Sequence, residues 1–180
     1  MLPVPQKGEG GFAASGTCLV VRSPAFAWIG TGAGGSARVF RSVNRGATWT
    51  VAEAPIFHAS KASGIATLAF RDSVNGLALG GDIGDATSHT DNVAATFDGG
   101  KTWRLTGKPI MSGAIYGSAW VPGAAKPTVV IVSPKGAEFS ADNGADWISL
   151  STKAYWAVGF APNGVGWMVG PGGRITKVAF

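Results

Sequence analysis

One acidic segment that contains a histidine is the first candidate for chemistry. Three aspartates and one histidine lie within ten residues of one another: Asp82, Asp85, His89 and Asp91. Carboxylate oxygens and an imidazole nitrogen can together hold a divalent ion. Their spacing matches no calcium-binding loop, however. We therefore interpret the segment as a polar loop between strands and predict no metal site.

A second candidate activity is the hydrolysis of sialic acid glycosides. The tyrosines and glutamates are too few and too far apart in the sequence for it. That reaction needs three arginines around a carboxylate, a Tyr–Glu pair as nucleophile and an aspartic acid as acid–base catalyst. The chain has two tyrosines and three glutamates: Tyr116, Tyr155, Glu9, Glu53 and Glu138. No spacing pairs Tyr116 with a glutamate, and the arginines show no triad. We predict no catalytic residue.

Other reactive groups also lack the context that their chemistry needs. Cys18 lies in an apolar run, which favours a buried, inert thiol. The glycine-rich segment 32–35 lacks the Lys-Ser/Thr pair and the helix of a phosphate-binding loop, so we expect a turn. No serine stands in a G-x-S-x-G motif, and we place His58 in a loop. We expect no cofactor.

Composition predicts many short strands. Of the 180 residues, 46% are hydrophobic and 14% are charged, which excludes a disordered polyelectrolyte, and 28 glycines and 10 prolines punctuate the chain. The net charge of +5 comes from basic residues that are scattered singly, so we expect no nucleic-acid partner. No apolar stretch reaches the ~18 residues of a membrane span. The first residues show no signal peptide, and the compartment stays open.

Three segments of eight residues align without gaps and predict the architecture. Each has a hydroxyl residue, then Asp or Asn two positions later, Gly four positions later and Trp seven positions later. The tryptophans are 54 and 44 residues apart, close to the length of one four-stranded propeller blade. The aligned residues are Ser42, Asn44, Gly46 and Trp49, then Thr96, Asp98, Gly100 and Trp103, then Ser140, Asp142, Gly144 and Trp147.

Elementary chemistry explains why this pattern predicts a hairpin turn. Asp or Asn accepts hydrogen bonds from the amides of the turn, and Gly supplies a positive φ. The Trp begins the outgoing strand and buries its ring between sheets. Apolar runs that precede each octamer predict the other strands, with inner strands at 16–21, 65–70, 115–120 and 155–160.

The repeats therefore predict one all-β domain over residues 1–180. We expect an open or partial β-propeller of about four blades, each an antiparallel four-stranded sheet, with units that start near residues 11, 63, 113 and 154. The fourth unit is incomplete because its last strand, at 174–177, meets no octamer.

The octamers resemble the Asp-box, also called the bacterial neuraminidase repeat (BNR). The longer unit resembles the bacterial propellers related to the photosystem II stability and assembly factor, over residues 11–178. This resemblance implies that the octamers are structural, that the chain corresponds to the C-terminal half of a six- or seven-bladed ring, and that full-length relatives are exported. Asn44 departs from the motif and should weaken its turn slightly. Asp-boxes also occur in sialidases and sortilin-type receptors, so the motif says little about function.

The expected function is a non-catalytic scaffold that binds a protein partner and assists the assembly of a larger complex. The alternative is a sialidase-like glycoside hydrolase that acts on glycans. Residues to inspect for binding are Arg22, Arg71, Tyr116 and Trp120. A half-ring would expose sheet edges and apolar faces, so it needs further blades or self-association to cover them.

Overall fold

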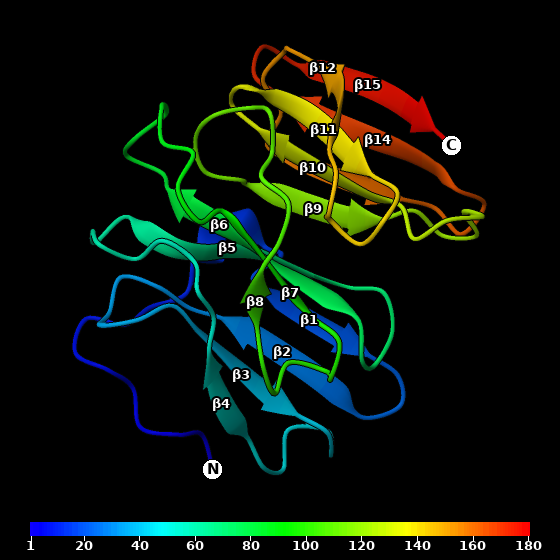
Figure 1. The fold of residues 1–180 in the computed structure, drawn as a ribbon. Coiled ribbons are helices and arrows are strands. Elements are labelled where there is room, and N and C mark those ends of the chain that lie inside the picture. The colour runs from blue at the N-terminus through cyan, green and yellow to red at the C-terminus, as the bar shows by residue number, and fades with distance from the viewer.

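The computed structural model describes residues 1–180, except for the side chain of Ser15. In this described part the chain forms fifteen strands and one short 3-10 helix, η1 (Ala13–Ser15). The strands form four antiparallel sheets, which follow one another along the chain (Figure 1). The prediction of an all-β fold built from blade-like sheets is therefore confirmed.

Within each sheet, strands pair in sequence order. The first sheet contains β1 (Leu19–Arg22), β2 (Phe26–Gly30), β3 (Arg38–Ser42) and β4 (Thr50–Glu53). The second contains β5 (Ser63–Phe70), β6 (Gly76–Asp82), β7 (Val93–Thr96) and β8 (Arg104–Leu105). The third contains β9 (Gly117–Trp120), β10 (Val129–Ser133), β11 (Gly136–Ser140) and β12 (Ile148–Ser151). The fourth contains β13 (Ala157–Phe160), β14 (Val165–Gly170) and β15 (Arg174–Ala179).

Three of the four inner strands are shorter than the apolar runs that predicted them, whereas β5 begins two residues before its run 65–70. The strands β9 and β13 begin two residues after the starts of the runs 115–120 and 155–160. Ile115 and Tyr155 are nevertheless buried, at 1% and 2% exposure, because they pack into the cores between sheets while they lie outside the strands. An apolar run in the sequence indicates which residues are buried. Buried residues also occur outside the hydrogen-bonded strand, so the run does not give the strand's first residue.

Three hydrophobic cores lie between successive sheets. The first contains Trp28 and Phe70, the second Leu77 and Ile131, and the third Val130 and Met168. Alternate residues of one strand therefore face different neighbours: Val130 packs toward the fourth sheet, and Ile131 packs toward the second. Both faces of the second and third sheets are covered.

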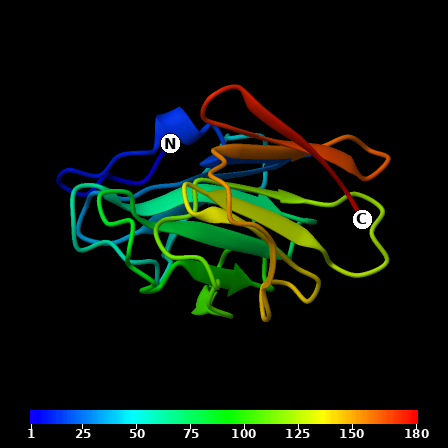
Figure 2. The same ribbon diagram turned by 90° about the horizontal axis from the view of Figure 1, so that it is seen from above.

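The inner strands β1, β5, β9 and β13 lie next to one another in that order. A chain of hydroxyl groups also links this inner region. Thr17 Oγ1 donates to Thr67 Oγ1 at 2.8 Å, and Thr67 Oγ1 lies 2.7 Å from Ser118 Oγ. Figure 2 shows the same stacking of sheets from above. Among the described residues, no helix is both long and apolar enough to cross a membrane.

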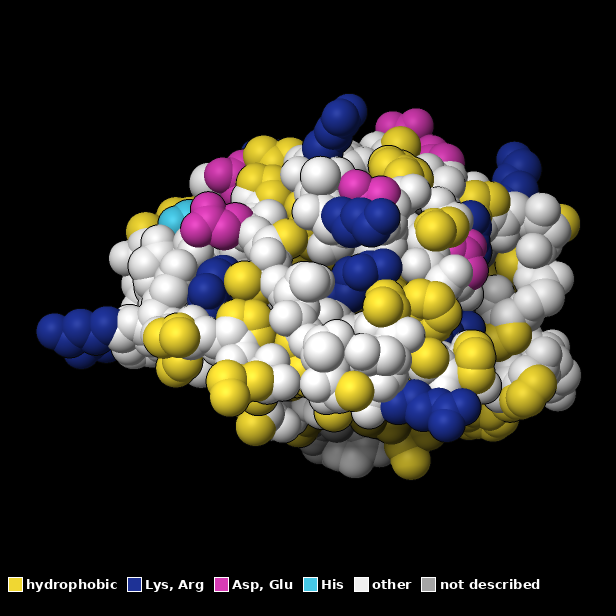
Figure 3. Space-filling model, turned by 90° about the horizontal axis from the view of Figure 1, so that it is seen from below, with side chains coloured by type: hydrophobic (Ala, Val, Ile, Leu, Met, Phe, Trp, Pro, Cys, Tyr) yellow, Lys and Arg dark blue, Asp and Glu magenta, His cyan; other side chains and the backbone are white. Residues whose placement is uncertain are grey.

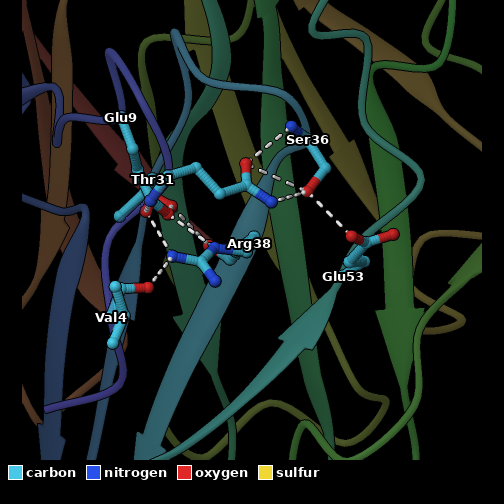
Figure 4. Close-up of polar contacts among 7 residues, drawn as sticks. Val4, Glu9, Thr31, Ser36, Arg38 and Glu53 are labelled. Carbon is cyan, nitrogen blue, oxygen red and sulfur yellow. Dashed lines mark hydrogen bonds and ion pairs between the residues drawn. The ribbon is translucent and has the colours of Figure 1, made fainter.

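The N-terminal segment is fastened to the first sheet by a polar network (Figure 4). The Arg38 guanidinium forms an ion pair with the Glu9 carboxylate, and it also donates to the Val4 carbonyl at 3.1 Å. Thr31 Oγ1 donates to Glu9 at 2.6 Å. Burial of Glu9 favours its neutral acid, but the hydrogen bonds from Arg38, Thr31 and the Gln6 amide together outweigh this effect and lower the pKa of Glu9.

Candidate functional site

The three octamers adopt nearly the same turn, and each turn joins the third and fourth strands of a sheet. The hydroxyl oxygens of Ser42, Thr96 and Ser140 accept from the amide of the glycine four residues later, at 2.9, 2.8 and 2.8 Å. Those glycines have φ of +83°, +90° and +87°, a conformation that side chains rarely adopt. The turn is therefore closed by contacts within the octamer itself.

The side chain at the third octamer position accepts hydrogen bonds from backbone amides of the turn. Asp98 accepts from the amides of Lys101 and Thr102, each at 3.0 Å, and Asp142 accepts in the same way from Ala145 and Asp146. Asn44 Oδ1 accepts the amide of Thr48 at 2.9 Å, whereas the amide of Ala47 donates instead to the Asn44 backbone carbonyl. The first turn thus replaces one side-chain contact with a backbone contact.

The aspartates of the turns are held in their ionised form. Burial of Asp98 favours the neutral acid, but hydrogen bonds from Thr102, Thr96 and Lys101 together lower its pKa far below the ordinary range. For Asp142, burial is likewise outweighed by hydrogen bonds from Asp146, Ser140 and Ala145, so its pKa is lowered. Both carboxylates therefore accept hydrogen bonds within their own turns.

The tryptophans of the octamers occupy equivalent places, each one residue before an outer strand. The prediction that they begin the strands is wrong by one residue. Each indole lies over the glycine of its own turn. A Cβ added at Gly46, Gly100 or Gly144 would lie 3.7, 3.4 or 3.5 Å from Cζ2 of that tryptophan. Trp103 and Trp147 are buried, at 8% and 7% exposure, whereas Trp49 is half-buried.

Two arginines from neighbouring sheets converge on one cavity. Arg22 ends β1 and Arg71 follows β5, so they stand at corresponding ends of adjacent inner strands. With Trp120, which ends β9, and the loop 121–128, they line a cavity of about 470 Å³. Among the described residues that line this cavity none is acidic, and Lys126 adds a third positive charge. The cavity is therefore suited to an anionic ligand.

The cavity arginines keep hydrogen-bond donors for a ligand. Arg22 donates through Nε and Nη2 to the Phe70 carbonyl, while Arg71 donates to Asn143 Oδ1 at 3.0 Å and pairs with Asp72 at 3.3 Å. The described contacts use neither Arg22 Nη1 nor Arg71 Nη2. The Arg71 guanidinium lies 5.7 Å from the centre of the Trp120 ring.

Trp120 lines the same cavity. Its indole nitrogen is buried and has no acceptor among the residues that the structure describes.

Of the four residues that the sequence marked for inspection, Tyr116 lies elsewhere. It lines an apolar cavity of about 310 Å³ together with Ile83 and Trp156. The loop 121–128 was missed by sequence analysis, because no motif marks it and its place depends on how the second and third sheets pack. The convergence of Arg22 and Arg71 had one usable signal, since both follow apolar runs at the same point of the repeat.

The remaining candidates have ordinary roles. Asp82 and Asp85 accept turn amides at 2.8 and 2.9 Å, and the described side chains contain no group of three or more metal ligands. Glu138 is buried and accepts from the amides of the loop before β9. Cys18 is half-buried rather than fully buried, and it directly precedes β1. His58 contacts the Ile56 carbonyl in a loop.

Comparisons with known proteins identify the fold. No family model matches the chain, and no curated protein matches it. It is similar to the crystal structure of a GH74 enzyme from Niastella koreensis, with a TM-score of 0.62 and 14% identity over 86% of this chain and 27% of that chain. It is also similar to YCF48 bound to D1 peptide, with a TM-score of 0.50 and 16% identity over 84% of this chain and 45% of that chain.

The chain thus spans less than half the length of either structure. At these identities the likeness concerns the fold alone. Four successive antiparallel sheets, each packed on the next, form part of a β-propeller-like fold.

Proposed function

We propose that this chain is a non-catalytic propeller scaffold of the photosystem II assembly factor-like type, whose octamers are structural Asp-boxes. In this proposal, the cavity formed by Arg22, Arg71 and Trp120 binds an acidic segment of a protein partner. The single observation that carries the proposal is the convergence of two arginines from adjacent sheets on a cavity with no acidic lining residue among those described.

The chemistry of the cavity supports this ligand class. Guanidinium groups bind carboxylates through charge-assisted hydrogen bonds, and an indole face supplies apolar contact area. A propeller presents such groups on a rigid frame, so binding requires no catalytic constellation. The similar solved structure of YCF48 is described as bound to a peptide. That description is consistent with a peptide ligand for this fold.

The alternative is a glycoside hydrolase, because a similar structure is a GH74 enzyme. Hydrolysis of glycosides usually requires two carboxyl groups about 5–10 Å apart. The basic cavity supplies no carboxylate from its described lining, which favours binding over hydrolysis. Release of free sugar from a sialylated glycan would support the enzyme and contradict the scaffold.

Fluorescence anisotropy with two labelled peptides tests the binding proposal. One peptide is a glutamate-rich dodecamer, and the other carries glutamine at every glutamate position. We expect the first to bind about tenfold or more tightly than the second, since each charge-assisted contact contributes over 1 kcal/mol. Arg22→Gln and Arg71→Gln should each weaken binding of the acidic peptide by about tenfold.

The matched control is Arg104→Gln, which removes an exposed arginine of the outer strand β8. This variant changes the net charge by the same amount and should leave the affinity unchanged. Equal affinity for both peptides, or an equal loss with Arg104→Gln, would show that any binding reflects overall charge, and the proposal would then be wrong. Thermal melts of all three variants verify that they fold.

A further inference from the structure

The contacts between successive sheets follow a repeated arrangement. The octamer of the second sheet covers β2 of the first: Trp28 Nε1 donates to the Gly99 carbonyl at 2.7 Å, and a Cβ at Gly100 would lie 3.2 Å from the same nitrogen. The octamer of the third sheet covers β6 of the second, where a Cβ at Gly144 would lie 3.3 Å from the Leu77 side chain. The first and second sheets therefore each receive the turn of the sheet that follows them.

Strand register identifies the residue of each sheet that receives this turn. In the second sheet Phe70 pairs with Gly76, and Leu77 is the next residue. In the fourth sheet Phe160 pairs with Gly166, and Trp167 is the next residue. Both pairs place a phenylalanine ring against a glycine, at 2.6 and 2.5 Å from an added Cβ. Trp167 therefore occupies the receiving position of the fourth sheet.

No sheet of the described chain covers Trp167. Its side chain is 46% exposed, whereas its equivalents Trp28 and Leu77 are 0% and 1% exposed. Val169 and Ile175, which pair across β14 and β15, are 41% and 69% exposed. The fourth sheet thus ends in an apolar receiving face, defined here by Trp167, Val169 and Ile175.

The first sheet carries the surface that would pack on such a receiving face. Its octamer turn and Trp49 flank a cavity of about 600 Å³ that Leu19 and Val21 also line. Val21 stands at the register position that Phe70 occupies in the second sheet, because it pairs with Ala27 just before Trp28. Phe70 stacks on Trp28 at 3.8 Å between ring centres, whereas Val21 is 70% exposed. Figure 3 views the molecule from below Figure 1 and shows several hydrophobic patches among polar and basic groups.

We propose that a second copy of this chain covers both faces, head to tail. The first sheet of each copy packs its turn and Val21 onto the receiving face of the other copy's fourth sheet. The interface would repeat the arrangement that already joins the first and second sheets within one chain. Because each copy carries one face of each kind, a closed ring of two copies would leave neither face uncovered.

The number of sheets favours two copies over a longer assembly. Head-to-tail contacts form a closed ring when the rotation closes and a filament when it does not. Two copies contribute twice the four sheets of one chain, which reaches the upper end of the range of about 4–8 blades for propellers. A third copy would exceed that range.

Sedimentation velocity of the purified full chain tests this proposal. We expect a single species of twice the 18.2 kDa chain mass. Trp167→Glu and Val21→Glu each place a carboxylate on one of the two faces, and each should raise the dissociation constant by about thirtyfold or more. Both side chains are substantially exposed in the single chain, so the variants should fold.

The control is Leu105→Glu, at a 48% exposed residue of the outer strand β8 that belongs to neither face. It should leave the species distribution unchanged. A head-to-tail ring requires both face variants to dissociate it, so loss of the dimer with only one of them would contradict the proposal. A monomeric wild-type chain or an open series of larger species would contradict it as well.

Discussion

The first and second sheets carry the same turn but place its tryptophan in different surroundings. Ser42 and Thr96 close their turns with matching hydrogen bonds, at 2.9 and 2.8 Å. Trp103 is nevertheless buried against the first sheet, whereas Trp49 is half-buried beside an open cavity. The comparison shows that the octamer determines the turn, and that the neighbouring sheet determines how much its tryptophan stabilises the fold.

The two sheets also differ in what covers them. The second sheet packs apolar side chains on both faces, into the first and second cores. The first sheet packs on one face only within the described chain, and the polar network around Arg38 and Glu9 ties the N-terminal segment to it (Figure 4). Hydrophobic burial is insensitive to pH, whereas an ion pair is not, so the two sheets should respond differently to acid.

The largest expected effect separates the two tryptophans. Trp103→Ala should lower the free energy of unfolding by about 4 kcal/mol, because it removes a buried ring from the first core. Trp49→Ala should cost about 1 kcal/mol, because less apolar surface is lost. Urea unfolding of both variants in a Val21→Glu background measures the difference without any contribution from self-association. Equal costs would refute the distinction between the two sheets.

The ion pair of the first sheet should give the next largest effect. Arg38→Met leaves the Glu9 carboxylate buried without its partner, which should cost about 3 kcal/mol. Since the pKa of Glu9 is lowered in the folded state, its contribution is present above the ordinary carboxyl pKa and is lost as the pH falls through the lowered value.

Hydrogen exchange at pH 7 and pH 3 locates this effect. Amides of the N-terminal segment and β3 should lose protection at pH 3 or in Arg38→Met. Those of β6 should remain protected, and they serve as the internal reference. If Glu9→Gln combined with Arg38→Met is as unstable as Arg38→Met alone, the unpaired charge is not the cause.

The smallest effect concerns the third octamer position. Asp98→Asn replaces a carboxylate that accepts two backbone amides with a neutral amide. It should lower the free energy of unfolding by about 1 kcal/mol at pH 7. The folded pKa of Asp98 is depressed, so its stabilisation exists above the unfolded carboxyl pKa and disappears as the pH falls through the folded one. Asp98→Asn should therefore lose less stability than the wild type between pH 7 and pH 2.

The reverse substitution provides the matched control. Asn44→Asp should give the first turn the acid sensitivity that it now lacks and stabilise it by a few tenths of a kcal/mol at pH 7. Denaturant titrations at the two pH values measure both variants. No change in the pH dependence of either variant would show that these side chains act by shape rather than by charge.

The sequence was sufficient for the turns, since the side-chain hydrogen bonds that close them join residues within the same eight. Ser140, Asp142 and Gly144 were marked by type and spacing, and the structure places them in one closed turn. The ends of the inner strands were less predictable. Tyr155 looks like a strand residue because it is apolar and buried, yet its backbone continues a loop into β13.

Tertiary structure alone decided which side chains of different sheets meet and how deeply each turn tryptophan is buried. Arg22 and Arg71 belong to different sheets, so their meeting at Trp120 depends on the angle between those sheets and on the loop 121–128. Trp49, Trp103 and Trp147 are alike in sequence and differ in burial because each ring packs on the preceding sheet, and the described chain has none before the first. Local hydrogen bonds are set by neighbours along the chain, whereas burial is set by neighbours in space.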